Sequence, residues 1–262
     1  MAMPGRQNPG RLVRAQVLPW FRWGVLAGDR LEQRLVITGT DTGVGKTRVA
    51  RLLLEALARA GQTAVGMKPV ASGCQASASG LRSDDAEILL AASGVSADYS
   101  DINPYSLAPS CAPHLAAREC HVDIRLEKII ESFRRLQQMA PWVLVEGVGG
   151  WMVPLDEKLM LSDVARALRL PVILVVGLRL GCLNHALLTV SAIRRERLPL
   201  AGWIANQIDP AMTRADENIA TLKEKIEAPM LARFPYHPLG NHDSTPSAFP
   251  HEMIMHLTQI TD

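Results

Sequence analysis

Short apolar runs alternate with longer amphipathic stretches along the chain from Arg34 onward. The apolar runs predict strands at residues 35–38, 64–68, 142–146, 172–176, 202–205 and roughly 230–234. The amphipathic stretches predict helices at residues 46–60, 85–92, 126–138, 183–195 and 214–227. Most of the strands are apolar throughout rather than alternating, which is typical of a mainly parallel sheet covered by helices on both faces. The pattern therefore predicts a doubly wound α/β fold, in which ligands bind beyond the carboxyl ends of the strands.

Length and composition are those of a globular protein. A chain of 262 residues can form one large α/β domain or at most two small ones. Hydrophobic residues make up 48% and charged residues 21%, and the formal net charge is only +2, so nothing indicates nucleic acid as a partner. No apolar stretch approaches the roughly 18 residues that span a bilayer, so no membrane partner is expected. The cysteines lack C-x-x-C spacing, which indicates neither a zinc site nor disulfides and favours a cytoplasmic setting.

Residues 1–33 differ in composition from the rest of the chain. They contain five arginines and two tryptophans, but only one aspartate, one glutamate and no lysine. An organelle transit peptide is also rich in arginine and poor in acidic residues, but it is usually rich in serine, which is absent here. The sequence therefore favours a misassigned start or a disordered tail. We expect residues 34–262 to form a single folded domain.

A phosphate-binding loop follows the first predicted strand. Residues 39–47 read G-T-D-T-G-V-G-K-T and lead directly into an amphipathic helix. Small residues allow consecutive backbone N–H groups to point at phosphate oxygens, and the helix N-terminus adds its positive end. Lys46 would neutralise the β- and γ-phosphates, and the Thr47 hydroxyl would coordinate magnesium. The loop is a variant of G-x-x-x-x-G-K-[ST], with Thr40 in place of the first glycine, and it predicts a P-loop NTPase-type fold that binds ATP and Mg²⁺.

Two further segments contain charged and polar residues that could reach the phosphate site. Lys68 ends the second predicted strand and precedes P-V-A-S-G, so it should point a fixed positive charge at the phosphate pocket. Ser72 in the same segment offers a hydroxyl. The sequence S-D-D-A at residues 83–86 precedes a periodic apolar run, so one of these residues should cap a helix while a carboxylate remains free. We expect Asp84 to be the cap and Asp85 to be the free carboxylate.

A third apolar strand ends in a carboxylate. Residues 142–150 read W-V-L-V-E-G-V-G-G, which has the form of a Walker B strand followed by a glycine-rich turn. Glu146 at the end of this strand can hold magnesium directly or through water. The glycines allow the backbone to lie against a nucleotide or a substrate.

Together these segments resemble the dethiobiotin synthetase family. In chain order the matching segments are G-T-D-T-x-V-G-K-T, K-P-V-A-S-G, S-D-D-A, N-P-Y, V-L-V-E-G-x-G-G-W, P-V-I-L-V-V-G, G-C-L-N-H-A and A-G-W-I-A-N. They lie between residues 35 and 236, about three quarters of the chain, and K-P-V-A-S-G with G-C-L-N-H-A is far more specific than the P-loop alone. The resemblance implies a homodimeric ligase that uses ATP and Mg²⁺ to convert 7,8-diaminononanoate and carbon dioxide to dethiobiotin.

The resemblance also implies roles for individual residues. The triphosphate would be surrounded by Thr42, Gly43, Val44, Gly45, Lys46 and Thr47. Other residues that would bind the nucleotide are Arg48, Gly147, Val148 and Gly149. Magnesium would be held by Thr47, Asp85 and Glu146. Lys46 and Lys68 would be catalytic, and Ser72 would position the carbamate formed from the diamine. The adenine base would be bound by Asn206, Gln207, Pro235, Tyr236 and His237. The substrate carboxylate would be bound by Gly181, Cys182, Leu183 and Asn184 of the second subunit.

The chain departs from the family pattern at three positions. Gly43 stands where some members carry glutamate, Gln207 where the residue is often acidic, and Tyr236 where it is often tryptophan. The last two bear on nucleotide selectivity.

Two other classes of P-loop protein remain as alternatives. Partitioning ATPases carry a signature lysine at the position of Asp41, and its absence here argues against them. Amidating enzymes of the cobyrinate type require ammonia from a glutaminase domain, for which this chain has no room.

Overall fold

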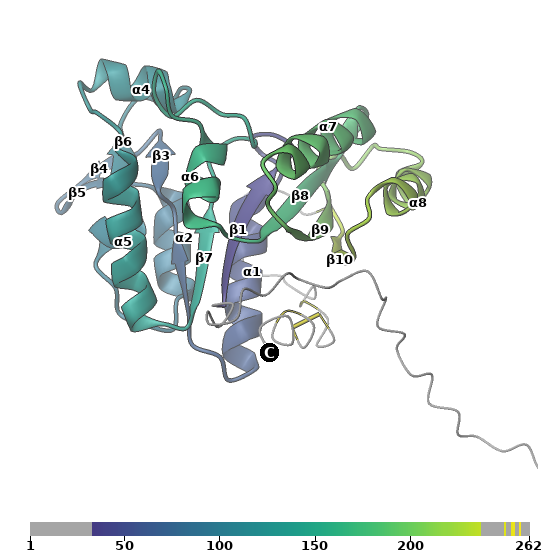
Figure 1. Ribbon diagram of the computed structural model, residues 1–262, viewed down its shortest axis with the longest axis horizontal. Helices are drawn as coiled ribbons and strands as arrows, with labels where there is room; N and C mark the ends of the chain where they lie inside the picture. Colours follow the sequence, from purple (N-terminus) through teal and green to yellow (C-terminus); the bar gives the residue numbers. More distant parts are fainter. Residues whose placement is uncertain (1–32, 237–248, 250–252, 255–256, 258–262) are drawn as a thin grey trace, which may run out of the picture. The chain divides into compact units, whose positions relative to one another are not determined.

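A computed structural model of the chain describes residues 33–236, together with residues 249, 253, 254 and 257. These residues form strands and helices that alternate along much of the chain (Figure 1). The strands are β1 (Arg34–Gly39), β2 (Ala64–Met67), β3 (Val70–Ser72), β4 (Gln75–Ser77), β5 (Gly80–Arg82), β6 (Tyr105–Leu107), β7 (Trp142–Glu146), β8 (Val172–Leu178), β9 (Leu200–Gln207) and β10 (Met230–Phe234). The helices are α1 (Lys46–Arg59), α2 (Asp84–Ala92), α3 (Tyr99–Ile102), α4 (Pro113–Glu119), α5 (Leu126–Met139), α6 (Leu161–Leu168), α7 (Cys182–Arg195) and α8 (Ala215–Lys225).

The central sheet is parallel throughout. Its strands lie in the order β10-β9-β8-β1-β7-β2, so β1 lies between β8 and β7 near the middle. In a parallel sheet the carboxyl ends of all strands lie at the same edge. After β1 the chain forms β2 and β7 on one side of it, and then β8, β9 and β10 on the other side. Such a change in direction creates the crevice in which ligands bind in doubly wound folds. The loop after β1 is the predicted P-loop.

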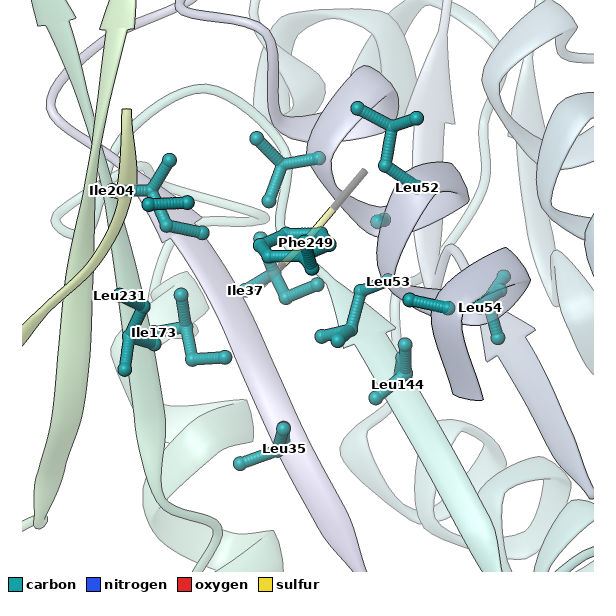
Figure 2. Close-up of a cluster of buried hydrophobic side chains, with 14 of the residues drawn as sticks. Leu35, Ile37, Leu52, Leu53, Leu54, Leu144, Ile173, Ile204, Leu231 and Phe249 are labelled. Carbon is teal, nitrogen blue, oxygen red and sulfur yellow. The ribbon is translucent and has the colours of Figure 1, made fainter. Parts of the chain in front are cut away.

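Alternate residues of each strand pack against opposite layers of helices. Leu35 and Ile37 of β1 lie in a cluster with the apolar face of α1, whereas Val36 lies in a second cluster with residues of α5 and α6. A third cluster joins β8 and β9 to α7 and α8. Phe249 packs into the first cluster with Ile37 and Leu53, as Figure 2 shows. Both faces of the sheet are therefore covered, which explains why its strands are apolar at nearly every position.

All predicted helices and strands are present, with ends that differ by no more than two residues. The second predicted strand ends one residue early, because the Lys68 N–H donates to the Ile102 carbonyl at 2.7 Å instead of joining the sheet. β9 continues two residues beyond the predicted end. Asn206 and Gln207 are polar, but they still pair in register with Gly177 and Leu178 of β8.

The sequence pattern missed the short elements. β3, β6, α3 and α4 lie between the carboxyl end of β2 and α5, and β4 and β5 form a separate antiparallel pair in the same region. Most of them have only three or four residues, which is too short for a helical or strand period to be recognised. α6, with eight residues, was also missed.

The prediction for residues 1–33 lies outside the described residues, except for Gln33. The Gln33 carbonyl accepts a hydrogen bond from the Val143 N–H at 3.0 Å, so it already contacts the sheet. Among the described residues, no helix is long and apolar enough to cross a membrane.

Candidate active site

The P-loop connects β1 to α1 at the carboxyl edge of the sheet. Gly43 and Gly45 have positive φ angles of 72° and 90°, which glycine adopts without steric cost. A Cβ atom on Gly45 would collide with the side-chain amide of Asn206, so this position admits only glycine. A Cβ on Gly43 would meet nothing within 4 Å. A glutamate, which some family members carry at this position, would therefore fit in space here, but the positive φ is unfavourable for it.

Three contacts join the first half of the loop to β8 and the residue after it. The Thr40 N–H donates to the Val175 carbonyl at 3.0 Å, and the Thr40 hydroxyl accepts from the Gly177 N–H at 3.3 Å. The Arg179 guanidinium forms an ion pair with the Asp41 carboxylate. Thr40 stands in place of the first glycine of the standard pattern, and its hydroxyl therefore has a structural role in joining the loop to β8.

Arg179 is a contact that the sequence interpretation missed. The predicted strand stopped at residue 176, whereas β8 continues to Leu178, which makes Arg179 the first residue beyond its carboxyl end. Residues at that position line the ligand crevice in this fold. The correct strand end would have identified it.

Lys46 begins α1 and is buried against the loop that precedes it. Its Nζ donates to the main-chain carbonyl of Asp41 at 2.9 Å. Burial, reinforced by the nearby positive charge of Lys68, lowers the pKa of Lys46 to about 8. A phosphate group would relieve that penalty, because it supplies the negative charge that the lysine lacks.

Lys68 lies at the centre of a charged cluster. Its side chain is only 3% exposed, and its Nζ lies 2.6 Å from Glu146 Oε1 and 2.8 Å from Asp85 Oδ2. The Thr47 hydroxyl donates to the same Glu146 oxygen at 2.7 Å. Residues from the ends of β2 and β7 and the starts of α1 and α2 thus meet at one edge of the sheet, as the sequence predicted for that edge.

The pKa values in this cluster reflect a balance of burial and charge. Burial alone would lower the pKa of Lys68, but Glu146 and Asp85 outweigh it and hold that pKa above the usual lysine value. Burial would raise the pKa of Asp85, but the Lys68 ammonium holds it below the usual range. For Glu146, which is fully enclosed, burial dominates and raises the pKa. The ammonium therefore stays charged between its two partners.

The cluster fits a magnesium ion that is shared with phosphates. Glu146 Oε2 is buried and has no hydrogen-bond partner among the described residues, so it can accept a cation. The Thr47 hydroxyl and the half-exposed Asp85 carboxylate offer further oxygens of the kind that Mg²⁺ prefers. No group of three or more His, Cys, Asp or Glu in the described part of the chain could hold a metal by itself. Nucleotide oxygens and water would have to complete the coordination.

The prediction that Asp84 caps its helix is wrong. Ser83 is the N-cap of α2, and its hydroxyl accepts from the Ala86 N–H at a long 3.5 Å. Asp84 is the first helical residue, so it lies inside the helix and not at the cap position. Asp85, the next residue, takes no part in the cap, and its carboxylate pairs with Lys68.

The glycine-rich turn after β7 lies beside the P-loop. The Gly147 N–H donates to the Ile37 carbonyl of β1 at 2.9 Å, and the Gly147 carbonyl accepts from Lys68 Nζ at 3.4 Å. Val148 is half-buried. Gly149 has a positive φ of 61°, and a Cβ there would lie 3.5 Å from Thr42 Oγ1. The turn and the loop therefore face each other at the predicted phosphate site.

Asn206 supports the P-loop from the end of β9. Its side chain is buried; Nδ2 donates to the Val44 carbonyl at 2.7 Å, and Oδ1 accepts from Arg48 Nη1 at 3.2 Å. The same Arg48 nitrogen lies 3.4 Å from the Pro235 carbonyl. Arg48 therefore joins the two segments that were predicted to bind the base. Each polar atom of the Asn206 amide retains one further hydrogen-bonding capacity.

The other residues predicted to bind adenine are more exposed. Gln207 Nε2 donates to the Asp209 carbonyl at 3.4 Å, and Tyr236 is 40% exposed. His237 lies outside the described residues.

The residues predicted to bind the substrate lie on two separate elements. Ser72 is the last residue of β3, paired with Leu107 of β6, and is half-buried. Gly181 is the N-cap of α7, with a positive φ of 94°. Leu183 is half-buried and Asn184 exposed, but the Cys182 side chain is buried and its N–H donates to the Arg179 carbonyl at 3.0 Å. The Cys182 side chain therefore has little to offer a substrate.

The chain is similar to known proteins over most of its length. Residues 33–243 match a family model described as an AAA domain. The ATP-dependent dethiobiotin synthetase of Xanthomonas oryzae pv. oryzae is 50% identical over 202 residues, which cover 77% of this chain and 90% of that protein. The chain belongs to the dethiobiotin synthetase family. The corresponding synthetase of Pseudomonas aeruginosa is 52% identical over 200 residues, which cover 76% of this chain and 88% of that protein.

Solved structures confirm the P-loop NTPase-type fold. The septum site-determining protein of Pyrococcus horikoshii complexed with Mg-ADP has a TM-score of 0.54 at 15% identity, over 88% of this chain and 96% of that chain. A putative plasmid partition protein of Borrelia burgdorferi bound to AMPPNP has a TM-score of 0.51 at 12% identity, over 87% and 97%. At such identities only the fold is shared. Membership of the dethiobiotin synthetase family therefore decides against the partitioning alternative.

Proposed function

We propose that this protein catalyses the ATP-dependent conversion of 7,8-diaminononanoate and carbon dioxide to dethiobiotin, in biotin biosynthesis. It is a ligase that forms carbon–nitrogen bonds, in keeping with its family. The observation that supports this proposal most directly is the buried Lys68 ammonium, held beside the P-loop between two carboxylates. Such an arrangement places fixed positive charge where a phosphoryl group would be transferred.

The proposed chemistry needs orientation and charge neutralisation from the protein. Carbon dioxide adds to one unprotonated amine of the substrate to give a carbamate. A carbamate oxygen then attacks the γ-phosphate of ATP, which forms a carbamic-phosphoric mixed anhydride and releases ADP. The second amine attacks the anhydride carbon and loses a proton, which closes the ureido ring as the carbon–oxygen bond to phosphate breaks and phosphate leaves. No protein nucleophile is required, so the site has mainly to hold the diamine and exclude water.

The residues of the site have different parts in this proposal. Lys46 contacts the β- and γ-phosphates of bound ATP, whereas Lys68 meets the charge that develops as the γ-phosphoryl group moves. Thr47, Asp85 and Glu146 would hold Mg²⁺, which would supply further positive charge to the phosphates. The Ser72 hydroxyl orients the carbamate.

A direct assay tests the proposed function. Phosphate release from ATP should require both 7,8-diaminononanoate and bicarbonate as the source of carbon dioxide, because the phosphoryl acceptor forms only from the two together. Phosphate release and dethiobiotin formation should occur in equal amounts, measured by a coupled phosphate assay and mass spectrometry. Phosphate release that is unchanged when the diamine is omitted would contradict the proposal.

We also propose a homodimer in which the start of α7 serves the partner's active site. Leu180, just before α7, is 94% exposed, and Leu187 and Leu188 of α7 are exposed as well, although large apolar side chains are more stable when buried. Burial of these side chains against a second copy would bring the helix N-terminus, which favours an anion, to the substrate carboxylate.

Sedimentation should therefore show a species of twice the chain mass. Leu188→Glu should convert it to a monomer and raise the KM for the diamine, because it places a charge within the buried contact. Met139→Glu is the matched control: Met139 is an exposed apolar residue at the end of α5, and its replacement should leave the dimer intact. Full activity of a monomer at nanomolar concentration would exclude a shared site.

A further inference from the structure

The N-P-Y segment contains a buried amide to which the proposed mechanism gives no role. Asn103 is only 3% exposed. Its Nδ2 donates to the main-chain carbonyls of Lys68 at 2.6 Å and of Tyr105 at 3.2 Å. Its Oδ1 accepts from the hydroxyls of Ser106 at 2.6 Å and Tyr99 at 3.1 Å. All four hydrogen-bonding capacities of the amide are therefore used, which fixes its orientation.

The Asn103 amide holds the backbone of Lys68 just beyond the end of β2, where the strand hydrogen bonds have stopped. β2 ends at Met67, so Lys68 is already outside the ladder of strand hydrogen bonds. Its N–H donates instead to the Ile102 carbonyl at 2.7 Å, and its carbonyl accepts from Asn103 at 2.6 Å. Two adjacent residues at the end of α3 thus position the main chain from which the Lys68 ammonium extends.

Tyr99 connects the same amide to the helix that carries Asp85. The Tyr99 hydroxyl donates to Asn103 and accepts from the Ser83 N–H at 2.7 Å. Ser83 is the N-cap of α2, and its capping bond is long at 3.5 Å, so the shorter bond that its N–H donates to Tyr99 contributes to holding this helix start. The Arg82 guanidinium lies 3.8 Å from the centre of the Tyr99 ring and further restrains it.

We propose that Tyr99 and Asn103 are positioning residues, which together fix the Lys68 ammonium relative to the Asp85 carboxylate. The inference rests on the proposed function, since it concerns the placement of that catalytic pair. One hydrogen-bonded unit sets the backbone of Lys68 at one end and the start of α2 at the other. Catalytic groups need to be held within about 0.5 Å of their productive geometry, and residues behind the site commonly provide that restraint.

Tyr99→Phe tests this role, with Tyr105→Phe as its matched control. The Tyr105 hydroxyl also accepts from a main-chain N–H, that of Arg125 at 2.8 Å, and donates to the Arg125 carbonyl at 3.4 Å. Arg125 is the N-cap of α5, which carries no residue of the charged cluster. Tyr105 is the more deeply buried of the two, so its replacement should lower Tm at least as much. Tyr99→Phe should lower kcat roughly tenfold, within the ~10²-fold that a misplacement of about 1 Å can cause. The KM for ATP should stay nearly constant in both variants.

Coupling to Asp85 distinguishes positioning from general stability. In an Asp85→Asn background, Tyr99→Phe should lower kcat little further, because both changes disrupt the same pair. Equal kcat values for the two tyrosine variants, or independent losses in the Asp85→Asn background, would overturn the inference. Asn103→Leu is the more direct change, but it leaves two carbonyls unpaired and can prevent folding, so the tyrosine variants decide.

The proposed function and this inference can fail separately. Wild-type protein that forms no dethiobiotin would refute the proposed function alone. Crystal structures of the two variants then decide the positioning role: Lys68 Nζ and Asp85 should be displaced in Tyr99→Phe and unmoved in Tyr105→Phe. Unmoved positions in both variants would refute it.

Discussion

Lys68→Gln should lower turnover by roughly 10²–10³, about 3–4 kcal/mol, by analogy with removal of one preorganised donor to a developing oxyanion. The ammonium is buried and fixed by Glu146 and Asp85, so it costs no reorganisation when charge develops on the transferred phosphoryl group. Affinity for ATP should weaken much less, because only interactions that are stronger in the transition state change the chemical step. Steady-state kinetics and ATP titration calorimetry measure the two effects.

Stability has to be followed in the same experiment. Lys68→Gln removes one partner of a buried ion pair, which typically costs about 3–5 kcal/mol, so circular dichroism should confirm folding at the assay temperature. Lys68→Arg keeps a cation between the carboxylates and should recover much of the stability but only part of the turnover. Lys223→Gln controls for the change of net charge, because Lys223 is an exposed residue of α8, which contributes nothing to the charged cluster. Near-normal turnover of folded Lys68→Gln would show that the lysine is only structural.

Lys46→Gln should impair both nucleotide binding and turnover. The P-loop lysine touches phosphates in the ground state as well as in the transition state, so its loss is not confined to the chemical step. Loss of one hydrogen bond to a charged group is worth about 1.5–3 kcal/mol, which predicts an ATP affinity roughly 10–100-fold weaker. The same calorimetric titration, run beside Lys68→Gln, gives the comparison.

The contrast between the two lysines is the critical result. Lys46 Nζ already lies against the loop at the Asp41 carbonyl, whereas Lys68 Nζ lies among carboxylates. Lys46→Arg should restore part of the ATP affinity, because it returns the positive charge. If Lys46→Gln bound ATP as tightly as wild type, the loop would not be the phosphate site.

The local pattern of residues was enough to predict the sheet and the loop. Strands such as β7, apolar at four positions before Glu146, can lie only between two layers of helices. G-K-T after a strand and before a helix defines a phosphate loop, because that chemistry needs small residues and a helix N-terminus in consecutive positions. Lys68, Asp85 and Glu146 could be selected individually, because each lies at or just after the end of an apolar run or at a helix start, and such ends meet at one edge.

Only the tertiary structure decided which of these groups touch. Lys68 pairs with Asp85 and Glu146, which lie 17 and 78 residues further along the chain, and no local pattern specifies such contacts. The same holds for the ion pair of Arg179 with Asp41, and for the hydrogen bond from the Asn103 amide to the Lys68 carbonyl. Serine and aspartate can both cap a helix, so the sequence cannot decide between Ser83 and Asp84, and the position of the cap depends on where the backbone turns. Periodicity reports which face of an element is buried, but partner and distance depend on how separate elements pack, and that is a property of the whole fold.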